Sequence, residues 1–378
     1  MKKNQRIGIL TLVASDNCGS LLQTYALQKK LISLGYEKVE VIDFQSENSK
    51  RIYDIFPKNI FIQPRKFLFS ILKYKRLKKQ KNDYDYFRKT ALKMSKKKYK
   101  NEKEIKNLET DYDVIVCGSD QIWNVCMFDF DKVFFLPNIN KVKKIAYAVS
   151  LGGQSLKEYE AQSELQSWIN DFSKISVREK QGKNDVSTLY TGEVEVLLDP
   201  TLLVSKQHWM QLAGNERIVE GKYIFYYSWC YNDKELIKVV KDIMEKTGLP
   251  VYVINASKWL FYSYNTYGFN LCEKGGPYTF LNLIYYAELI LVESLHGVIF
   301  STIFEKKFWY LNSCRNGDID QRNSYFLKLL GVENRIIDLE SEIDINEIMK
   351  DIIYEKKNQE IMQELRKKSI SWLEEALG

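Results

Sequence analysis

The feature that most limits the fold of this chain is a regular alternation of short apolar runs with amphipathic helical segments. The start of the chain shows the pattern, with apolar runs at 6–13 and 38–44 on either side of a polar turn and a helical segment at 21–36. Apolar residues recur through 21–36 near the helical period of 3.6 residues. A strand, a helix and a strand in this order predict a βαβ unit with two parallel strands.

The alternation continues in two series along the chain. The first series has expected strands at 112–118, 144–150, 174–179 and 193–200, and a helix at 155–172. The second series has expected strands at 222–229, 250–255, 289–294 and 308–312, and helices at 233–248 and 278–288. Two successive sheets followed by C-terminal helices predict an α/β protein with two Rossmann-like domains facing across a cleft.

The predicted domain limits follow from these two series. We expect an N-terminal Rossmann-like domain at 1–214, a C-terminal Rossmann-like domain at 215–340 and C-terminal helices at 341–378. A basic, aromatic segment at about 50–105 interrupts the first series and predicts a helical insertion in the N-terminal domain. A length of 378 residues is itself typical of two or three domains.

The positive charge of the chain, whose formal total is +7, is not spread evenly and is concentrated in the insertion. Residues 65–81 contain eight basic residues and no acidic one, and apolar residues are interleaved with cations from 52 to 81. This pattern is typical of a segment that lies on an anionic membrane surface. It is also typical of a solvated helix that packs its apolar face on its own domain, so both interpretations stand. No nucleic-acid-binding module is present to favour nucleic acid.

Several classes of protein are disfavoured by the sequence. Six cysteines lie far apart without a CxxC pair, and His208 has no histidine partner four residues on, so we expect no metal site and no disulfide framework. No run reaches the roughly 18 apolar residues of a membrane span, and no signal-peptide cleavage site follows the N-terminus. We expect a cytoplasmic protein, with residues 52–81 offering a peripheral contact with the inner face of a membrane.

Small and polar residues gather where two of the apolar runs end. Ligands of parallel sheets bind at this carboxyl edge, where glycine permits close approach and helix N-termini attract anions. The candidates for acceptor or anion binding are Asp16, Asn17, Gly19, Gln23, Gly118, Ser119, Gln121, Trp123 and Asn124. Neither stretch is a GxGxxG or Walker motif, and ordinary turn chemistry accounts for each equally well.

Charged residues also stand where apolar runs end. Arg178 ends the strand expected at 174–179, where its guanidinium can clamp a phosphate or carboxylate, or else neighbour Glu179 at the surface. Asp120 is the candidate to orient or deprotonate a hydroxyl group. Asp199 precedes Pro200, and the proline alone explains the end of that strand.

The segment VESLHGVIFS, residues 292–301, holds one of only two histidines. His296 follows an apolar run and precedes a helix that we expect to open at Gly297. Imidazole gains and loses a proton near neutral pH, so His296 is a candidate general acid/base. A half-buried loop histidine is the alternative. Ser294 lies close by, but no G-x-S-x-G elbow supports a hydrolase.

Six motifs occur together in one order, and as a set over about residues 7–312 they resemble the polysaccharide pyruvyl transferase family. The motifs are DNCGSLLQTYALQKKLISLGY, YDVIVCGSDQIWN, KIAYAVSLG, SVREKQG, LDPTLLV and ESLHGVIFSTIFEKKF. The resemblance implies a fold similar to GT-B glycosyltransferases. It also implies transfer of pyruvate from phosphoenolpyruvate, without a further cofactor, onto two hydroxyls of a sugar or lipid-linked oligosaccharide, which forms a cyclic ketal.

The resemblance also implies roles for single residues. In family members with established activity, an arginine matching Arg178 and the histidine of an R-L-H-G motif serve the donor. Leu295, His296 and Gly297 match that motif, and Ser294 stands at its arginine position. Cys18 stands where a tyrosine is more usual. The alternatives on the same architecture are a glycosyltransferase that uses a nucleotide sugar and a non-catalytic glycan-binding protein.

Overall fold

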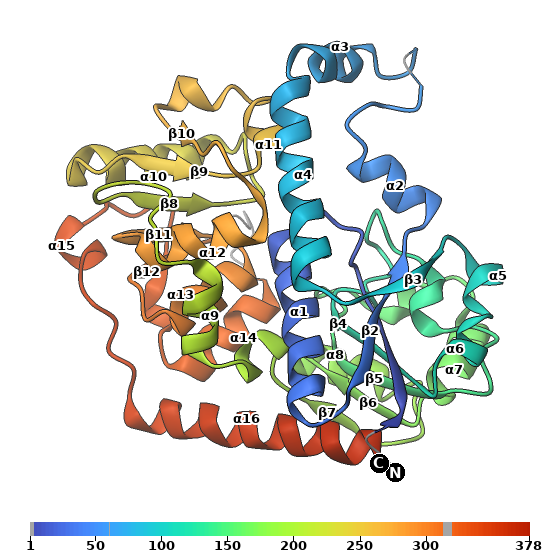
Figure 1. Ribbon diagram of the computed structural model, residues 1–378. Coiled ribbons are helices and arrows are strands. Elements are labelled where there is room, and N and C mark those ends of the chain that lie inside the picture. Colours follow the sequence, from blue (N-terminus) through green and yellow to red (C-terminus); the bar gives the residue numbers. More distant parts are fainter. Residues whose placement is uncertain (1–3, 60, 313–319) are drawn as a thin grey trace. The chain divides into compact units, whose positions relative to one another are not determined.

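The computed structural model of the chain describes residues 4–59, 61–312 and 320–378. These residues form two compact units, each built on its own parallel sheet (Figure 1). Unit 1 comprises residues 1–54, 88–204 and 361–378, and unit 2 comprises residues 55–87 and 205–360. The prediction of an α/β fold with two parallel sheets and additional helices is confirmed.

The sheet of unit 1 has seven strands in the spatial order β3-β2-β1-β4-β5-β6-β7. They are β1 (Arg6–Leu10), β2 (Lys38–Phe44), β3 (Met94–Tyr99), β4 (Val114–Asp120), β5 (Lys143–Val149), β6 (Lys174–Val177) and β7 (Val194–Val196). β1 lies parallel to both β2 and β4. The strand order reverses there, so the carboxyl ends of β1 and β4 form the switch point at which such sheets bind ligands.

The helices of unit 1 begin and end at ordinary sequence signals; Asn17, for example, caps the first helix by accepting from the N–H of Gly19 at 2.8 Å. The helices are α1 (Cys18–Ser33), α2 (Glu47–Tyr53), α5 (Glu102–Ile105), α6 (Leu108–Asp111), α7 (Gln162–Asn170), α8 (Lys180–Val186) and the C-terminal part of α16 (Lys356–Leu377). The 3-10 helices are η2 (Lys132–Phe135), η3 (Leu156–Glu158) and η4 (Pro200–Leu203). The central strands β1, β4 and β5 are almost wholly buried, because helices of this kind cover a parallel sheet on both sides.

The sheet of unit 2 has six strands in the order β10-β9-β8-β11-β12-β13. They are β8 (Ile224–Tyr227), β9 (Val251–Val253), β10 (Asn270–Leu271), β11 (Leu289–Val292), β12 (Phe308–Leu311) and β13 (Ile336–Ile337). Its helices and 3-10 helices are α3 (Pro64–Leu72), most of α4 (Tyr74–Ala91), α9 (Lys206–Ala213), α10 (Lys234–Thr247), α11 (Ala256–Trp259), η5 (Tyr264–Tyr267), α12 (Gly276–Tyr286), α13 (Leu295–Ile303), α14 (Gln321–Leu330), η6 (Glu333–Arg335), α15 (Ile345–Ile348) and the start of α16. The order reverses at β8, so the second switch point lies at the carboxyl ends of β8 and β11.

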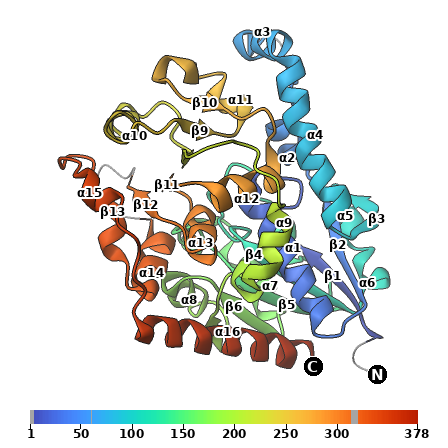
Figure 2. The same ribbon diagram turned by 60° about the vertical axis from the view of Figure 1, so that its left-hand side comes forward.

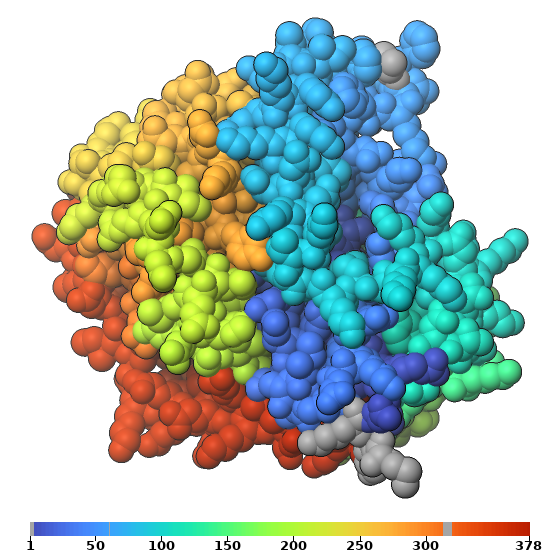
Figure 3. All heavy atoms as spheres, viewed as in Figure 1, coloured from blue at the N-terminus to red at the C-terminus, as the bar shows by residue number. Residues whose placement is uncertain are grey.

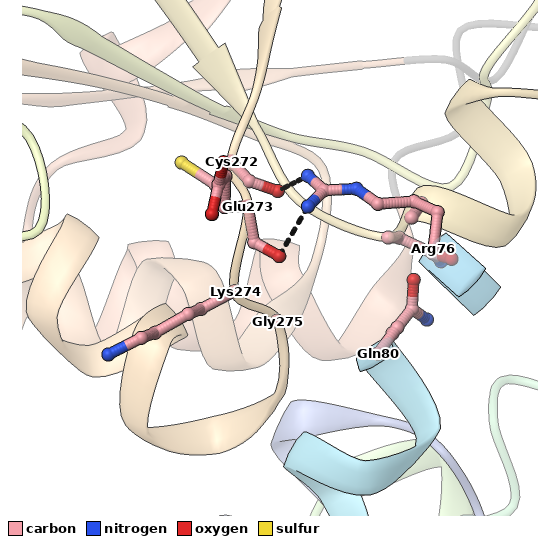
Figure 4. Close-up of a pocket in the computed structure, with 8 residues that line it drawn as sticks. Arg76, Gln80, Cys272, Glu273, Lys274 and Gly275 are labelled. Carbon is pink, nitrogen blue, oxygen red and sulfur yellow. Dashed lines mark hydrogen bonds between the residues drawn. The ribbon is translucent and has the colours of Figure 1, made fainter. Parts of the chain in front are cut away.

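The basic insertion belongs in part to unit 2, whereas the sequence attached it to the N-terminal domain. Arg76 on α4 donates to the carbonyl oxygens of Cys272 and Glu273 (Figure 4). Lys79 forms an ion pair with Glu273 at 2.9 Å, and Asp83 Oδ2 accepts from the N–H of Gly275 at 2.7 Å. These contacts hold residues 55–87 on the segment that follows β10.

The structure departs from the predicted limits in three other places. The unit boundary lies after residue 204, where Ser205 caps α9, and not after residue 214. The end of α16 belongs to unit 1, since Ser369 Oγ accepts from the N–H of Leu198 at 3.1 Å. β3 lies within the predicted helical insertion, and lysines fill its middle because it is an edge strand.

Two absences hold for the part of the chain that the structure describes. No group of three histidine, cysteine, aspartate or glutamate side chains is placed to hold a metal ion. No helix there combines the length and the apolar character needed to cross a membrane. Cys314, counted above among the cysteines, and Ile60, in the basic segment, lie outside the described residues.

Candidate functional site

The switch point of unit 1 is shaped by the turn that ends β4. Gly118 has φ of +115°, and a Cβ atom there would lie 2.3 Å from the carbonyl oxygen of Tyr147 on β5. Only glycine therefore fits at this position beside β5. Asp120 follows with φ of +80°, which turns its side chain at the end of the strand.

A closed ring of hydrogen bonds fixes this turn to β1 and α1. Ser119 N–H donates to Gln23 Oε1 at 3.0 Å, Gln23 Nε2 donates to Thr11 Oγ1 at 3.0 Å, and Thr11 Oγ1 donates to Ser119 O at 2.9 Å. All three side chains are fully buried. Ser119 and Gln23, predicted as binding residues, therefore act here as the framework of the site.

Arg178 lies at this edge of the sheet, just after β6. Its Nη2 atom donates to Ser119 Oγ at 2.7 Å and forms an ion pair with Asp199 Oδ2 at 2.8 Å. The residue is only 6% exposed, and its Nε and Nη1 atoms have no hydrogen-bond partner among the described residues. Buried guanidinium donors without a partner are uncommon, and they suit a phosphate or a carboxylate.

The alternative of a surface pair between Arg178 and Glu179 is not what the structure shows. Glu179 is buried and accepts from Ser150 Oγ at 3.0 Å and from the N–H of Leu151 at 2.8 Å. The partner of Arg178 is Asp199. The sequence analysis had given Asp199 no such role, because Pro200 was sufficient to explain the end of that strand. Thr201 fixes the carboxylate of Asp199 by donating its N–H at 2.9 Å and its Oγ1 at 2.6 Å.

A pair of buried carboxyl groups lies in the same unit. Asp120 Oδ1 accepts from the N–H of Gln121 at 2.9 Å, whereas Oδ2 has no hydrogen-bond partner within the described ranges. Burial raises the pKa of Asp129, and the nearby Asp120 carboxylate raises it as well. Tyr53 opposes this by donating its hydroxyl to Asp129 Oδ2 at 2.7 Å. A buried carboxyl group with a raised pKa, such as Asp129, is typical of a proton-transfer site.

Asp129 and Tyr53 were missed by the sequence analysis because neither belongs to a motif. Asp129 stands in a loop after the recognised YDVIVCGSDQIWN segment, and Tyr53 ends α2. The one signal in the sequence was an aspartate flanked by two phenylalanines, Asp129 in FDFDK at 128–132.

Other predicted residues of unit 1 have local structural roles. Asp16 forms an ion pair with Arg88 at 2.7 Å, and Asn17 caps α1 by accepting from the N–H of Gly19. Asn124 Nδ2 donates to Gln121 Oε1 at 3.0 Å. Trp123 is fully buried, and its Nε1 atom donates to a main-chain carbonyl oxygen at 3.2 Å, so its ring packs in the core.

The histidine motif lies at the switch point of unit 2. α13 begins at Leu295 rather than at Gly297, because Ser294 is its N-cap and accepts from the N–H of Gly297 at 3.0 Å. His296 is therefore the second residue of the helix and is half-buried, while Leu295 is buried. Gly297 is needed for close packing, since a Cβ atom would lie 2.8 Å from Val292 Cγ1. Figure 2 shows α13 beside the strands of this sheet.

Glu293 is a second residue that the sequence analysis missed. Its Oε2 atom accepts from the N–H of Trp229 at 3.2 Å and from the hydroxyl of Ser228, so it joins the ends of β11 and β8. Burial, and secondly the Glu293 carboxylate, raise the pKa of Tyr226 well above its ordinary value. The Tyr226 hydroxyl is consequently neutral and can serve only as a hydrogen-bonding group.

The structure thus groups the predicted residues in two sets. Unit 1 brings together Arg178, Ser119 and Asp120, with Asp199 and Asp129 added by the fold. Unit 2 brings together Ser294, Leu295, His296 and Gly297, with Glu293 added. Both sets stand at the carboxyl ends of parallel strands, as the sequence predicted for ligand-binding residues.

Comparison with solved structures shows the same architecture in proteins of low sequence identity. UDP-GlcNAc 2-epimerase from Methanocaldococcus jannaschii has 12% identity and a TM-score of 0.52, with 94% of this chain and 92% of that chain covered. The trehalose-6-phosphate synthase OtsA has 8% identity and a TM-score of 0.53, with 98% of each chain covered. S. aureus MnaA in a structure with UDP has 12% identity and a TM-score of 0.50, with 97% and 90% covered.

The structural similarity establishes a GT-B-like fold. At such low sequence identity it establishes no activity or substrate. The comparison with curated protein sequences gives no match. The family comparison matches polysaccharide pyruvyl transferases over residues 17–315, which is most of the chain and includes Asp120, Arg178 and His296. The chain therefore belongs to the polysaccharide pyruvyl transferase family.

Proposed function

We propose that this protein transfers pyruvate from phosphoenolpyruvate onto two hydroxyls of a sugar in a cell-surface polysaccharide or its lipid-linked precursor, forming a cyclic ketal. The observation that carries the proposal is the set of hydrogen-bond donors on the buried Arg178 side chain that are unpaired in the described part of the chain. Its guanidinium is held by Ser119 and Asp199, yet Nε and Nη1 have no partner within the described residues. Phosphoenolpyruvate offers both a phosphate and a carboxylate to such a group.

Ser294 does not supply the charge that an arginine would bring to its position. Its hydroxyl is engaged as the cap of α13, where it accepts from the N–H of Gly297. Arg178 is therefore the cation that we assign to the donor. The N-terminus of α13 adds the partial positive charge of a helix start.

The reaction requires proton transfer at two places. The methylene carbon of phosphoenolpyruvate takes up a proton and becomes a methyl group, and one sugar hydroxyl attacks the neighbouring carbon. The second hydroxyl then displaces phosphate from that carbon and closes the ring. Each hydroxyl loses its proton as its oxygen–carbon bond forms. One of these two protons replaces the proton added to the methylene carbon, and the departing phosphate takes up the other and leaves as hydrogen phosphate.

We assign these protons to His296, which follows β11, and to Asp120, which ends β4. His296 delivers the proton to the methylene carbon, because imidazole is the side chain that exchanges protons most readily near neutral pH. Asp120 accepts a proton from an acceptor hydroxyl. Its Oδ2 atom has no hydrogen-bond partner among the described residues, and the nearby Asp129 provides a second carboxyl group.

Ligand-dependent thermal stability tests the donor. Phosphoenolpyruvate is expected to raise the melting temperature, with a stabilisation of about 2.7 kcal/mol at a concentration of 100 times Kd. Inorganic phosphate and pyruvate are the controls, since each represents one of the two chemical groups of phosphoenolpyruvate. Stabilisation by UDP or a UDP-sugar without any response to phosphoenolpyruvate would favour a nucleotide-sugar glycosyltransferase instead.

Mass spectrometry of the glycan tests the product. Glycan from cells with the gene is expected to carry one pyruvate, less one water, for each modified sugar, and glycan from cells without it is not. Identical glycan masses in both strains, with no stabilisation by any donor, would favour a non-catalytic glycan-binding protein.

A further inference from the structure

The helix α3 and the turn before it expose a group of large apolar side chains. Phe61 is 95% exposed, Leu68 58% and Leu72 70%, and Ile62 and Ile71 are also exposed. Leu68, Ile71 and Leu72 are spaced three and four residues apart, so they share one face of the helix. Contiguous exposed apolar surface of this kind marks a site of interaction.

The opposite side of α3 is packed on unit 2. Ser70 Oγ donates to the carbonyl oxygen of Ile55 at 2.6 Å, and the ring of Phe69 meets that of Phe261 edge to face at 5.4 Å. The ring of Phe67 lies 5.9 Å from that of Phe56. These contacts hold the helix in place, so Leu68, Ile71 and Leu72 form a fixed outward face.

Cations without acidic partners surround this face. No acidic residue occurs from 55 to 82. Arg76 and Lys79 are engaged in holding α4 on unit 2, as Figure 4 shows for Arg76. The exposed cations Arg65, Lys73, Lys75 and Lys78, by contrast, form no ion pair within the described ranges. Figure 3 shows the light-blue atoms of this segment at the surface of the face drawn.

We infer that this surface, formed by residues 61–62, α3 and the start of α4, docks on an anionic phospholipid bilayer. The apolar side chains enter the boundary between head groups and acyl chains, and Arg65, Lys73, Lys75 and Lys78 contact the phosphate groups. A second copy of the chain does not fit as well, since a two-fold contact would place these uncompensated cations against themselves. The inference goes beyond the proposed reaction and does not depend on it.

Sedimentation of the whole chain with lipid vesicles tests the docking. We expect binding to vesicles of phosphatidylcholine with 30% phosphatidylglycerol to be at least roughly tenfold tighter than to phosphatidylcholine alone, since each cation near an anionic surface contributes about 1 kcal/mol. Raising the salt concentration from 0.1 M to 1 M shortens the Debye length from about 10 Å to about 3 Å, and binding should fall accordingly. Equal binding to both vesicle types would contradict the inference.

Two pairs of substitutions separate the apolar and charged contributions. Leu68→Asp with Leu72→Asp should weaken binding to the anionic vesicles by about tenfold or more, because each leucine loses its burial in the interface. The matched control is Ile353→Asp, at a residue that is 85% exposed elsewhere in unit 2. Lys73→Glu with Lys75→Glu should have an effect of similar size, and Lys234→Glu with Lys238→Glu on α10 should have little.

Thermal unfolding of each variant shows whether it is folded, which is expected because all substituted side chains are exposed. Folded variants of α3 that bind anionic vesicles as tightly as the controls would overturn the inference. Light scattering that shows a dimer abolished by Leu68→Asp with Leu72→Asp, with no vesicle binding by the original chain, would overturn it in favour of contact between copies.

Discussion

The two units share the order of their strands but differ in what stands at the switch point. In each sheet the order reverses at the first strand of the unit, β1 or β8, and the neighbouring strand, β4 or β11, completes the edge. At the end of β4, Ser119 is buried and belongs to a ring of hydrogen bonds, and it contacts the Arg178 side chain that is paired with Asp199. At the end of β11 a capped helix presents a half-buried histidine. The shared strand order therefore places a switch point at the same position in each sheet, and the residues at that position decide the chemistry of the site.

The difference arises because the seven-stranded sheet of unit 1 brings residues from several strand ends together at the end of β4. Arg178 follows β6 and donates to Ser119 at the end of β4. Asp199 follows β7 and forms an ion pair with Arg178. Gly118 lies next to this point, where the Cβ atom of any other residue would meet the main chain of β5. The set in unit 2 is mostly local, since Ser294, His296 and Gly297 belong to one turn and one helix start.

The largest effect is expected from Arg178→Ala. The substitution leaves the buried Asp199 carboxylate without its cation, which should lower the free energy of unfolding by about 3–5 kcal/mol and abolish stabilisation by phosphoenolpyruvate. Urea unfolding and thermal shift measure the two effects. The double variant Arg178→Met with Asp199→Leu should regain much of the stability without regaining the donor response. A double variant that still responds to phosphoenolpyruvate would make Arg178 purely structural.

His296→Gln is expected to act on turnover and not on the fold. Pyruvyl transfer should fall by a factor of about 10² to 10⁴, because glutamine cannot carry the proton, while the melting temperature stays near that of the original chain. His208→Gln on α9 changes the only other histidine and is the matched control. A folded His296→Gln variant that keeps more than about a third of the original turnover would exclude proton transfer by His296.

Gly118→Ala tests the close approach of strands in unit 1. The new Cβ atom would meet a main-chain oxygen at 2.3 Å and the residue would keep a positive φ, so we expect a loss of about 2–4 kcal/mol in unfolding free energy. Gly153→Ala is the control, since Gly153 also has positive φ but no atom within 4 Å of the added Cβ. It should cost about 1 kcal/mol. Equal losses would mean that the approach of β4 to β5 is not needed.

Ser294→Ala should have the smallest effect, at about 1 kcal/mol of unfolding free energy, because it removes one N-cap hydrogen bond from α13. Ser294→Asp keeps a capping oxygen and should lose little stability. Chemical unfolding of the two variants compares them directly. A similar loss in both would show that the hydroxyl of Ser294 is needed for more than the cap.

The predicted site was most complete where its parts are close in sequence. His296, its helix and its glycine could be placed from one ten-residue segment, with an error of two residues in the helix start because the cap of Ser294 was not foreseen. Arg178 was expected to hold an anion, but its contacts with Ser119 and Asp199 were not foreseen, and Asp129 and Glu293 were missed altogether. The residues that contact Arg178, Asp129 and Glu293 lie on separate strands, helices or loops, and no local sequence pattern predicts such pairs.

The sequence by itself determined the α/β class and the two parallel sheets, because the period of apolar residues and the turn signals act over a few neighbouring residues. Only the tertiary structure decided that residues 55–87 join unit 2 and that the end of α16 joins unit 1. It also decided which cations of the basic segment are engaged, since Arg76 contacts residues almost 200 positions away and Lys75 contacts none of the described acidic groups. Such choices depend on the packing and hydrogen bonding of distant segments, which exist only once the chain has folded.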